Sequence, residues 1–220
     1  MCGAITIEAV NCTINLLIVQ TGSMQKTTPI VLNLIIINAL VFVAQMILDK
    51  TSGLTNYIAL YSYQSELFRP YQLVTHMFAH GGFMHILFNM YALWMFGSVL
   101  ERVWGPKKFL IFYLVCGLAA GLAQMFTMDL MGSAVGASGA IMGLLAAFAY
   151  LFPNVEFYIL PFPFPIKAKY MVAIYAAIDL FGGLHPGAAD NIAHFAHLGG
   201  LVMGFILVII WGKPGKQTFY

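Results

Sequence analysis

The chain has 220 residues, of which 61% are hydrophobic and only 8% are charged, and its formal net charge is +2. An ordinary soluble domain carries about 25% charged residues, so this composition excludes such a domain and favours a bundle of helices in lipid. The weak net charge gives no indication of a nucleic-acid partner. The cysteines fit neither a disulfide framework nor a zinc-binding pattern; they are Cys2, Cys12 and Cys116.

Six apolar segments are candidates for membrane-spanning helices, each of which needs about 20 mostly apolar residues. They are residues 29–48, 84–100, 107–127, 134–152, 168–184 and 193–212. Turn and loop residues separate these segments, and the prolines from Pro153 to Pro165 exclude a helix interior there. The sequence therefore predicts an all-α, polytopic membrane protein with six transmembrane helices.

One membrane domain is expected over residues 24–212, followed by a short cytoplasmic tail, residues 213–220. Residues 1–23 contain an apolar stretch but no basic start, so they are a poor signal peptide. The run Met24-Gln25-Lys26 looks like the natural start of a membrane protein. Residues 1–23 are therefore interpreted as an N-terminal extension, native or not, that takes no part in the mechanism.

Lysine and arginine indicate the orientation of the bundle, because positively charged segments stay in the cytoplasm. If the first span starts in the cytosol, the outside segments contain only Lys50 and Arg69. The inside segments then contain all the others, which are Lys26, Arg102, Lys107, Lys108, Lys167, Lys169, Lys213 and Lys216. Both ends of the chain are therefore predicted to lie inside.

Ser138 lies in the run Gly136-Ala137-Ser138-Gly139, near the outer start of the fourth predicted span. The flanking glycines let backbone pass close to the serine, and a helix N-terminus favours developing negative charge. This run is not the Gly-x-Ser-x-Gly nucleophile elbow, which requires a preceding strand. The alternative is a packing face of small residues, since Gly139 and Gly143 form a small-xxx-small pair.

His197 lies at a similar depth in the sixth predicted span, with Gly200 and Gly204 on the same helical face. That smooth face can approach the small residues of the fourth span closely, which would bring His197 to Ser138. A neutral imidazole at that place can take the serine proton. The alternative is a histidine satisfied by a backbone carbonyl.

His85 and Asn89 are four residues apart, so they share one face of the second predicted span. Both side chains can donate hydrogen bonds to a developing oxyanion, and the alternative is polar contact between helices. The serine, the histidine and this pair belong to three spans and all fall at the outer end. Helix packing does not require that coincidence.

These residues together resemble the signatures of the rhomboid family of intramembrane serine proteases. The three motifs are His80-x4-His85-x3-Asn89, Gly136-Ala137-Ser138-Gly139 and His197-x2-Gly200-x3-Gly204, and the similarity runs from about Arg69 to Gly204. The resemblance implies the six-helix core of the simple prokaryotic form. It also implies a dyad without an acid, in which Ser138 is the nucleophile and His197 the general base.

The resemblance assigns supporting roles as well. His85 and Asn89, with the backbone N–H of Ser138, would form the oxyanion hole, and His80 would brace the loop after the first span. Arg69, which follows Phe68, matches the arginine of a family Trp-Arg pair in that loop. Glu101 and Gly105 are similar to a family pair that is structural. Met142 takes the place of a tyrosine that in the family stacks on the catalytic histidine, and a thioether can pack on that ring.

The activity implied is hydrolysis of peptide bonds in single-span membrane proteins near the outer leaflet, with no cofactor and no metal. Substrate helices would enter sideways near the fifth span, and cleavage needs a locally unfolded helix. The resemblance and the orientation together imply a bacterial inner membrane protein with both ends inside and the site facing outside. The loop 182–192 is a plausible cap.

Two other classes of protein stay open as alternatives. One is a metal or haem membrane protein that uses His76, His80, His85, His194 and His197. The absence of His-Glu-x-x-His excludes one class of zinc protease, and a single aspartate inside a span argues against an aspartyl protease. The other is a non-catalytic rhomboid-like protein that only binds membrane clients.

Asp179 is that single intraspan aspartate. It could orient His197 as the third member of a triad, or it could make a structural hydrogen bond near the outer end of the fifth span. His194 is expected to be a loop or interface residue nearer the water, and His185 a loop residue.

Overall fold

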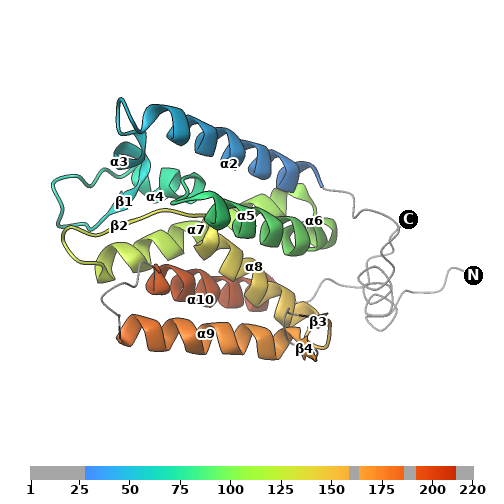
Figure 1. Cartoon of the computed structure of the whole chain (residues 1–220). Helices are drawn as coiled ribbons and strands as arrows, with labels where there is room; N and C mark the ends of the chain where they lie inside the picture. The colour runs from blue at the N-terminus through green and yellow to red at the C-terminus, as the bar shows by residue number, and fades with distance from the viewer. Residues whose placement is uncertain (1–27, 159–163, 186–191, 212–220) are drawn as a thin grey trace, which may run out of the picture.

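The computed structural model of the chain describes residues 28–158, 164–185 and 192–211 (Figure 1). The expected extension 1–23 and tail 213–220 lie outside the described residues, as does most of the loop 182–192. Four described helices are long and apolar enough to cross a membrane, namely Pro29–Leu48, Phe83–Trp104, Pro106–Thr127 and His194–Trp211. The prediction of a mostly helical, polytopic membrane protein is therefore confirmed.

Every one of the six predicted apolar segments contains a helix of the structure. The helices in these segments are α2 (Pro29–Leu48), α5 (Phe83–Ala92), α6 (Ser98–Trp104), α7 (Pro106–Thr127), α8 (Ser138–Leu151), α9 (Ala168–Leu184) and α10 (His194–Trp211). A π-helical turn, η2 (Leu93–Gly97), joins α5 to α6 into one continuous segment. With 14 and 17 residues, α8 and α9 are shorter than the other apolar segments.

The fourth predicted span begins four residues later than its hydropathy indicates. Residues Ser133–Ala134 form a short strand, β2, which pairs antiparallel with β1 (Leu60–Tyr61) in the loop after α2. Gly136 then adopts a φ of +134°, which L side chains rarely adopt, and α8 starts at Ser138. Apolar composition alone does not reveal this pairing, because its partner strand lies far away in the chain.

Two further loops contain structure that the sequence pattern did not predict. After α8, strands β3 (Glu156–Tyr158) and β4 (Pro165–Lys167) pair antiparallel, with Glu156 opposite Lys167. The loop between α2 and α5 contains α3 (Leu54–Ile58), α4 (Gln72–Thr75) and the 3-10 turn η1 (His76–Phe78). The fold is therefore mostly helical, as predicted, with two small two-stranded sheets added in the loops.

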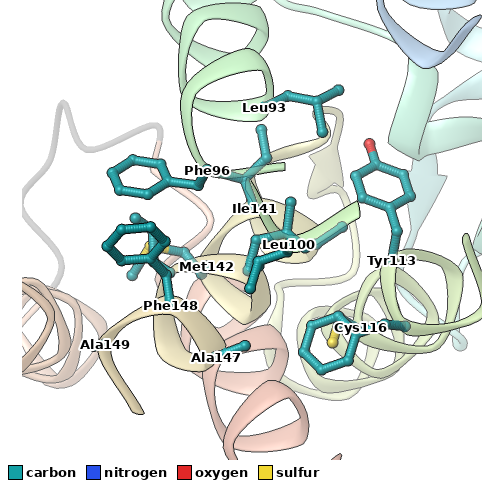
Figure 2. Close-up of a cluster of buried hydrophobic side chains, with 14 of the residues drawn as sticks. Leu93, Phe96, Leu100, Tyr113, Cys116, Ile141, Met142, Ala147, Phe148 and Ala149 are labelled. Atoms are coloured by element: carbon teal, nitrogen blue, oxygen red, sulfur yellow. The ribbon is translucent and has the colours of Figure 1, made fainter. Parts of the chain in front are cut away.

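Helix α8 lies among the other helices and contributes much of the hydrophobic core (Figure 1). Almost all of its residues are buried, and Figure 2 shows Met142 and Phe148 in a cluster with Phe96 of η2. The rings of Phe96 and Phe148 meet edge to face with centroids 5.2 Å apart. Because both of its ends are held by loops and its sides by other helices, α8 presents its first residue at a defined place.

The opposite end of the bundle is held by Glu101 of α6. Its buried carboxylate accepts hydrogen bonds from the backbone N–H groups of Ile30 at 3.0 Å and Val31 at 2.9 Å, and from the Thr28 hydroxyl. These are unpaired donors of the first turn of α2. The acidic side chain therefore caps the first long helix from another helix and joins the two.

Candidate active site

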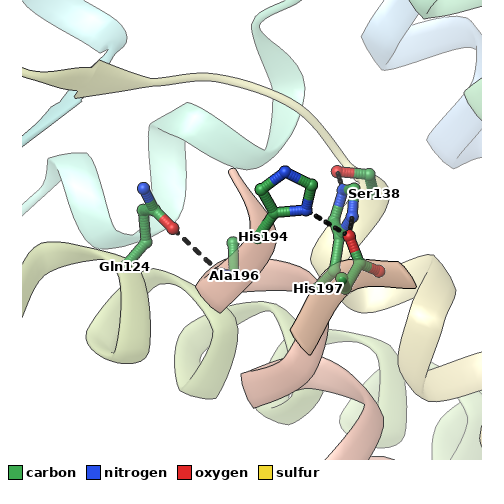
Figure 3. Close-up of polar contacts among 6 residues, drawn as sticks. Gln124, Ser138, His194, Ala196 and His197 are labelled. Carbon is green, nitrogen blue, oxygen red and sulfur yellow. Dashed lines mark hydrogen bonds and ion pairs between the residues drawn. The ribbon is translucent and has the colours of Figure 1, made fainter. Parts of the chain in front are cut away.

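Ser138 and His197 meet where the first turns of α8 and α10 come together. The His197 Nε2 atom lies 2.8 Å from Ser138 Oγ, and Figure 3 draws the two side chains next to each other. Ser138 is the first residue of α8 and is partly exposed, and the His197 side chain is 19% exposed. The pair is therefore close enough for proton transfer and open enough for a reacting group to reach it.

Two glycine contacts allow α8 and α10 to approach so closely. A Cβ atom added to Gly200 would lie 1.8 Å from the carbonyl oxygen of Gly139, and one added to Gly204 would lie 2.5 Å from the Cα of Gly143. Both contacts are with backbone, which cannot rotate out of the way. The spacing of Gly200 and Gly204 after His197 therefore places the histidine on the contact face, opposite the start of α8.

The carboxylate of Asp179, on α9, lies behind His197. Its Oδ1 atom is 3.0 Å from His197 Nδ1 and 2.8 Å from His194 Nδ1. An ionised carboxylate only accepts hydrogen bonds, so each Nδ1 carries the proton that is donated. This leaves His197 Nε2 as the acceptor for the Ser138 hydroxyl, which is the tautomer a general base requires.

His85 approaches Ser138 from α5. The backbone N–H of Gly81 donates to His85 Nδ1 at 3.3 Å, which leaves Nε2 as the donor nitrogen of the ring. A Cβ atom added to Gly136 would lie 2.9 Å from His85 Nε2 and 3.6 Å from Ser138 Oγ. The His85 nitrogen and the serine oxygen therefore both lie close to the Gly136 backbone. The Nε2 atom of His85 therefore lies in the neighbourhood of Ser138 Oγ.

Asn89 is less directly placed. It is buried, and its Nδ2 atom donates to the His85 carbonyl oxygen at 2.8 Å within α5. A side-chain amide has two donor hydrogens, so one remains for another acceptor. In this conformation Asn89 positions the helix turn that carries His85.

A cavity of about 1060 Å³ opens beside the pair. Its lining includes His85, the residues Ala134 and Val135 that precede the serine, and Gly182 and His194 on the other side. Neither Ser138 nor His197 is among the described residues that line it, although Val135 and His194, each three residues away from one of them in the chain, are. The cavity is large enough to hold water and an extended peptide segment beside the serine.

His80 and His76 belong to the loop between α2 and α5 and are both buried. The Gln45 side chain makes two hydrogen bonds with the backbone of His80. Its oxygen accepts from the His80 N–H at 3.0 Å, and its nitrogen donates to the His80 carbonyl oxygen at 3.3 Å. The His80 ring meets the His85 ring edge to face, with centroids 5.1 Å apart. His76 Nδ1 donates to the Gln72 carbonyl at 2.8 Å. His80 thus ties the loop to α2 and packs against His85, whereas His76 makes its hydrogen bond within the loop region.

Burial lowers the pKa of His76 to about 4 and that of His80 to about 4, with the neighbouring His85 lowering the latter further. The unfolded chain has the ordinary value of 6.5. Below pH 6.5 the unfolded chain binds protons at these two histidines, whereas the folded protein binds them only near pH 4. The free energy of unfolding therefore falls as the pH is lowered from 6.5 to about 4. Each histidine contributes up to about 3 kcal/mol of the loss, at about 1.4 kcal/mol per unit.

We expect thermal unfolding scans from pH 7.5 to 4.5 to show this loss in the wild type. A variant with His76→Gln and His80→Gln should give a flatter profile. The exposed His185 provides a matched control, because His185→Gln should reproduce the wild-type slope. An unchanged slope in the double variant would contradict this account of the acid sensitivity.

The remaining predicted residues lie further away. Arg69 is exposed, and its guanidinium donates to the carbonyl oxygens of Glu66 and Phe68, so it shapes the first loop. Met142 is buried in the hydrophobic cluster of Figure 2. The observed polar partner of the His197 ring on the side away from Ser138 is Asp179.

The structure also places His194 next to the candidate site, whereas the sequence pattern predicted a loop or interface residue. It is buried at the first turn of α10 and is hydrogen-bonded to Asp179. Its position three residues before His197 already placed the two on one helical face. Gln124 of α7 was not singled out, although its Oε1 accepts from the Ala196 backbone N–H at 3.0 Å and caps α10 (Figure 3).

The described histidines therefore make their contacts at several separate places. In the described part of the chain, no three histidine, cysteine, aspartate or glutamate side chains form a group that could hold a metal ion.

Comparison with known proteins gives consistent results. The Rhomboid domain family model matches residues 67–214. The chain is 35% identical over 150 residues to the rhomboid protease GluP of Bacillus subtilis, covering 68% of this chain and 27% of that protein. It is 32% identical over 151 residues to the putative rhomboid protease YdcA of the same species, covering 68% and 71%.

A mitochondrial relative, Rhomboid protein 1 of Saccharomyces cerevisiae, is 35% identical over 137 residues, which is 59% of this chain and 38% of that protein. The matched region is therefore less than half of the yeast protein and of GluP, and most of YdcA. Because the family model covers more than half of the chain, the resemblance seen in its motifs is confirmed. The chain belongs to the rhomboid family.

Proposed function

We propose that this protein is an intramembrane serine endopeptidase, with Ser138 as nucleophile and His197 as general base. The observation that carries the proposal is the 2.8 Å contact between His197 Nε2 and Ser138 Oγ, beside a large cavity. A serine and a histidine in this relation form the working part of serine hydrolases on unrelated folds. The relatives named rhomboid proteases support the same reading.

The geometry suggests the following sequence of steps. Ser138 Oγ attacks the carbonyl carbon of the scissile peptide bond while His197 Nε2 takes the hydroxyl proton. The carbonyl oxygen becomes negative and is stabilised by His85 Nε2–H, by the backbone N–H of Ser138 at the start of α8, and by the second amide hydrogen of Asn89. The proton on His197 then passes to the leaving amine as the C–N bond breaks, which leaves an ester on Ser138.

Water completes the reaction. A water molecule from the cavity attacks the ester carbon, and His197 again accepts the proton. The C–O bond to Ser138 breaks, the carboxylic acid leaves, and the serine regains its hydrogen. The cavity would supply the water for this step, because the ester cannot be hydrolysed in a dry hydrocarbon environment.

We infer that the substrates are membrane-spanning segments cut near the outer leaflet. In this arrangement α8 and α9 complete six spans, both chain ends lie inside, and the inner membrane of a bacterium is the proposed location. The charge distribution supports this orientation, since Lys50 and Arg69 are the only basic residues of the outside segments.

The direct test is cleavage of a single-span reporter protein in liposomes by the wild type and by Ser138→Ala. We expect the wild type to cut and Ser138→Ala to be inactive, with a loss of at least about 10⁴-fold. A fluorophosphonate probe, which reacts only with an activated serine, should label the wild type but not Ser138→Ala. Ser52→Ala, which removes an exposed hydroxyl in the turn after α2, is the matched control and should retain full activity.

Each outcome has a clear meaning. Cleavage that persists in Ser138→Ala contradicts the assigned nucleophile. A wild type that neither cuts a panel of reporters nor reacts with the probe contradicts the protease and favours a protein that only binds membrane clients.

A further inference from the structure

The carboxylate of Asp179 makes two hydrogen bonds that a serine–histidine pair alone does not require. Its Oδ1 atom accepts from His197 Nδ1 at 3.0 Å and from His194 Nδ1 at 2.8 Å. The side chains of Asp179 and His194 are only 9% and 7% exposed. A buried carboxylate is costly unless it is paired, so the three side chains form one connected unit behind Ser138.

The backbone around this unit is shaped to fit it. Gly182 follows Asp179 by three residues and shares its face of α9. A Cβ atom at Gly182 would lie 2.4 Å from His194 Nε2, so the glycine leaves the space that the His194 ring occupies. A Cβ atom at Gly183 would lie 3.2 Å from the Phe195 ring. These two glycines let α9 and α10 approach until the carboxylate reaches both histidines.

The start of α10 is fixed from the other side as well. Gln124 of α7 accepts the backbone N–H of Ala196, which lies between the two histidines (Figure 3). The first turn of α10 is thus held by α7 through its backbone and by α9 through its side chains. Neither imidazole can rotate without losing its bond to Asp179.

We propose that Asp179 is a positioning residue for the reaction described above, and that His194 holds Asp179 in place. The working unit is then Ser138, His197 and Asp179 in series, with His194 as a second donor to the same carboxylate oxygen. This inference rests on the proposed function. It differs from the dyad without an acid that the motifs alone imply.

The chemistry follows from which atoms carry hydrogen. The carboxylate keeps the proton of His197 on Nδ1, so that Nε2 stays free to accept the serine proton. When His197 becomes an imidazolium during the reaction, the nearby negative charge stabilises it. His194 fixes the carboxylate rotamer, because its donor reaches the same oxygen and prevents the group from turning away.

The alternative is that Asp179 only ties α9 to α10, and substitution separates the two roles. Asp179→Asn is nearly isosteric but introduces an N–H donor, which favours the wrong tautomer of His197. We expect kcat for reporter cleavage to fall about 10²- to 10⁴-fold with KM changed less than about twofold. Asp179→Glu, which keeps the charge, should recover part of the lost kcat.

A second variant perturbs the unit without removing a polar group. Gly182→Ala places a methyl group against the His194 ring and should lower kcat about tenfold or more, since small misplacements at a site are costly. Val202→Leu adds bulk to an exposed position of α10 and should leave kcat unchanged. Thermal unfolding of all variants shows whether each one is folded.

A spectroscopic readout tests the positioning without any cleavage assay. The ¹⁵N spectrum of histidine-labelled protein in detergent micelles distinguishes the two neutral tautomers, and His197→Gln identifies the His197 signals. We expect an Nδ1–H tautomer in the wild type and a shift towards Nε2–H in Asp179→Asn. Wild-type kcat and an unchanged tautomer in Asp179→Asn, with lowered stability only, would overturn the proposal.

The two proposals fail in different ways. If Ser138→Ala still cleaves, the proposed function is wrong, whereas the tautomer of His197 still reports whether Asp179 controls the ring. If Ser138→Ala is inactive but Asp179→Asn is fully active, the dyad acts alone.

Discussion

Replacement of His197 by alanine is expected to lower kcat for reporter cleavage by at least about 10⁴-fold. The reason is that Ser138 loses the nitrogen that takes its proton in the proposed reaction, which lies 2.8 Å away in the structure. A hydroxyl without a base is a weak nucleophile near neutral pH. Labelling of Ser138 by a fluorophosphonate should be lost in the same variant, although the serine is present.

Chemical rescue makes this test sharper. The alanine leaves a space the size of an imidazole ring beside the cavity of about 1060 Å³, and Asp179 remains to accept a hydrogen bond. Added imidazole should therefore restore measurable cleavage to His197→Ala and none to Ser138→Ala. His185→Ala, an exposed histidine at the end of α9, should behave as wild type without rescue. Full activity of His197→Ala would refute the assigned base.

The second large effect is expected at Gly200. A Cβ atom there would lie 1.8 Å from the Gly139 carbonyl oxygen, well inside the normal contact distance of about 3.5 Å. Gly200→Ala must therefore push α10 away from α8 at the turn next to the active pair. We expect a loss of about 1–3 kcal/mol in the free energy of unfolding and a large loss of activity, because Ser138 and His197 are carried on the two separated helices.

Thermal unfolding in detergent and fluorophosphonate labelling measure the two consequences separately. Val202→Leu, on the exposed face of the same helix, should change neither. A Gly200→Ala protein with wild-type melting temperature and wild-type labelling would show that α8 and α10 do not need this contact.

The parts of the fold that follow from local sequence were predictable. The apolar segments identify the long helices within a few residues, because a helix in lipid must satisfy its backbone within itself and needs about 20 apolar residues. The glycines after His197 indicated a smooth face, and the structure has that face against α8. These signals are carried by neighbouring residues on one helix.

The parts that depend on distant partners were not predictable. Leu60 pairs with Ala134 across more than 70 residues, which moves the start of α8 to Ser138. Hydropathy contains no information on such pairing. The strands β3 and β4 were not predicted, because the prolines of that loop exclude a helix but do not indicate which other structure forms.

The candidate site shows the same division. Ser138 and His197 are conspicuous because polar groups inside apolar segments are rare and expensive. Asp179 was conspicuous for the same reason, yet its partners could not be chosen, since the rotation of α9 about its axis is not encoded in hydropathy. His194 was misjudged because it lies at the first turn of α10, where composition does not distinguish a wet loop from a buried helix start.

The difference in length between α7 and α8 bears on where a substrate is cut. At 1.5 Å per residue, the 22 residues of α7 extend about 33 Å and the 14 residues of α8 about 21 Å. If both helices end near the same inner boundary, Ser138 lies roughly 12 Å below the opposite one. If the chain is the protease proposed above, its cleavage position would then be set from the far side of the bilayer. For a substrate helix anchored at that opposite boundary, a thicker bilayer would shift the bond presented to Ser138 by about one residue for each 1.5 Å. Lipid thickness would thereby set the register of the cut, with no change in the protein.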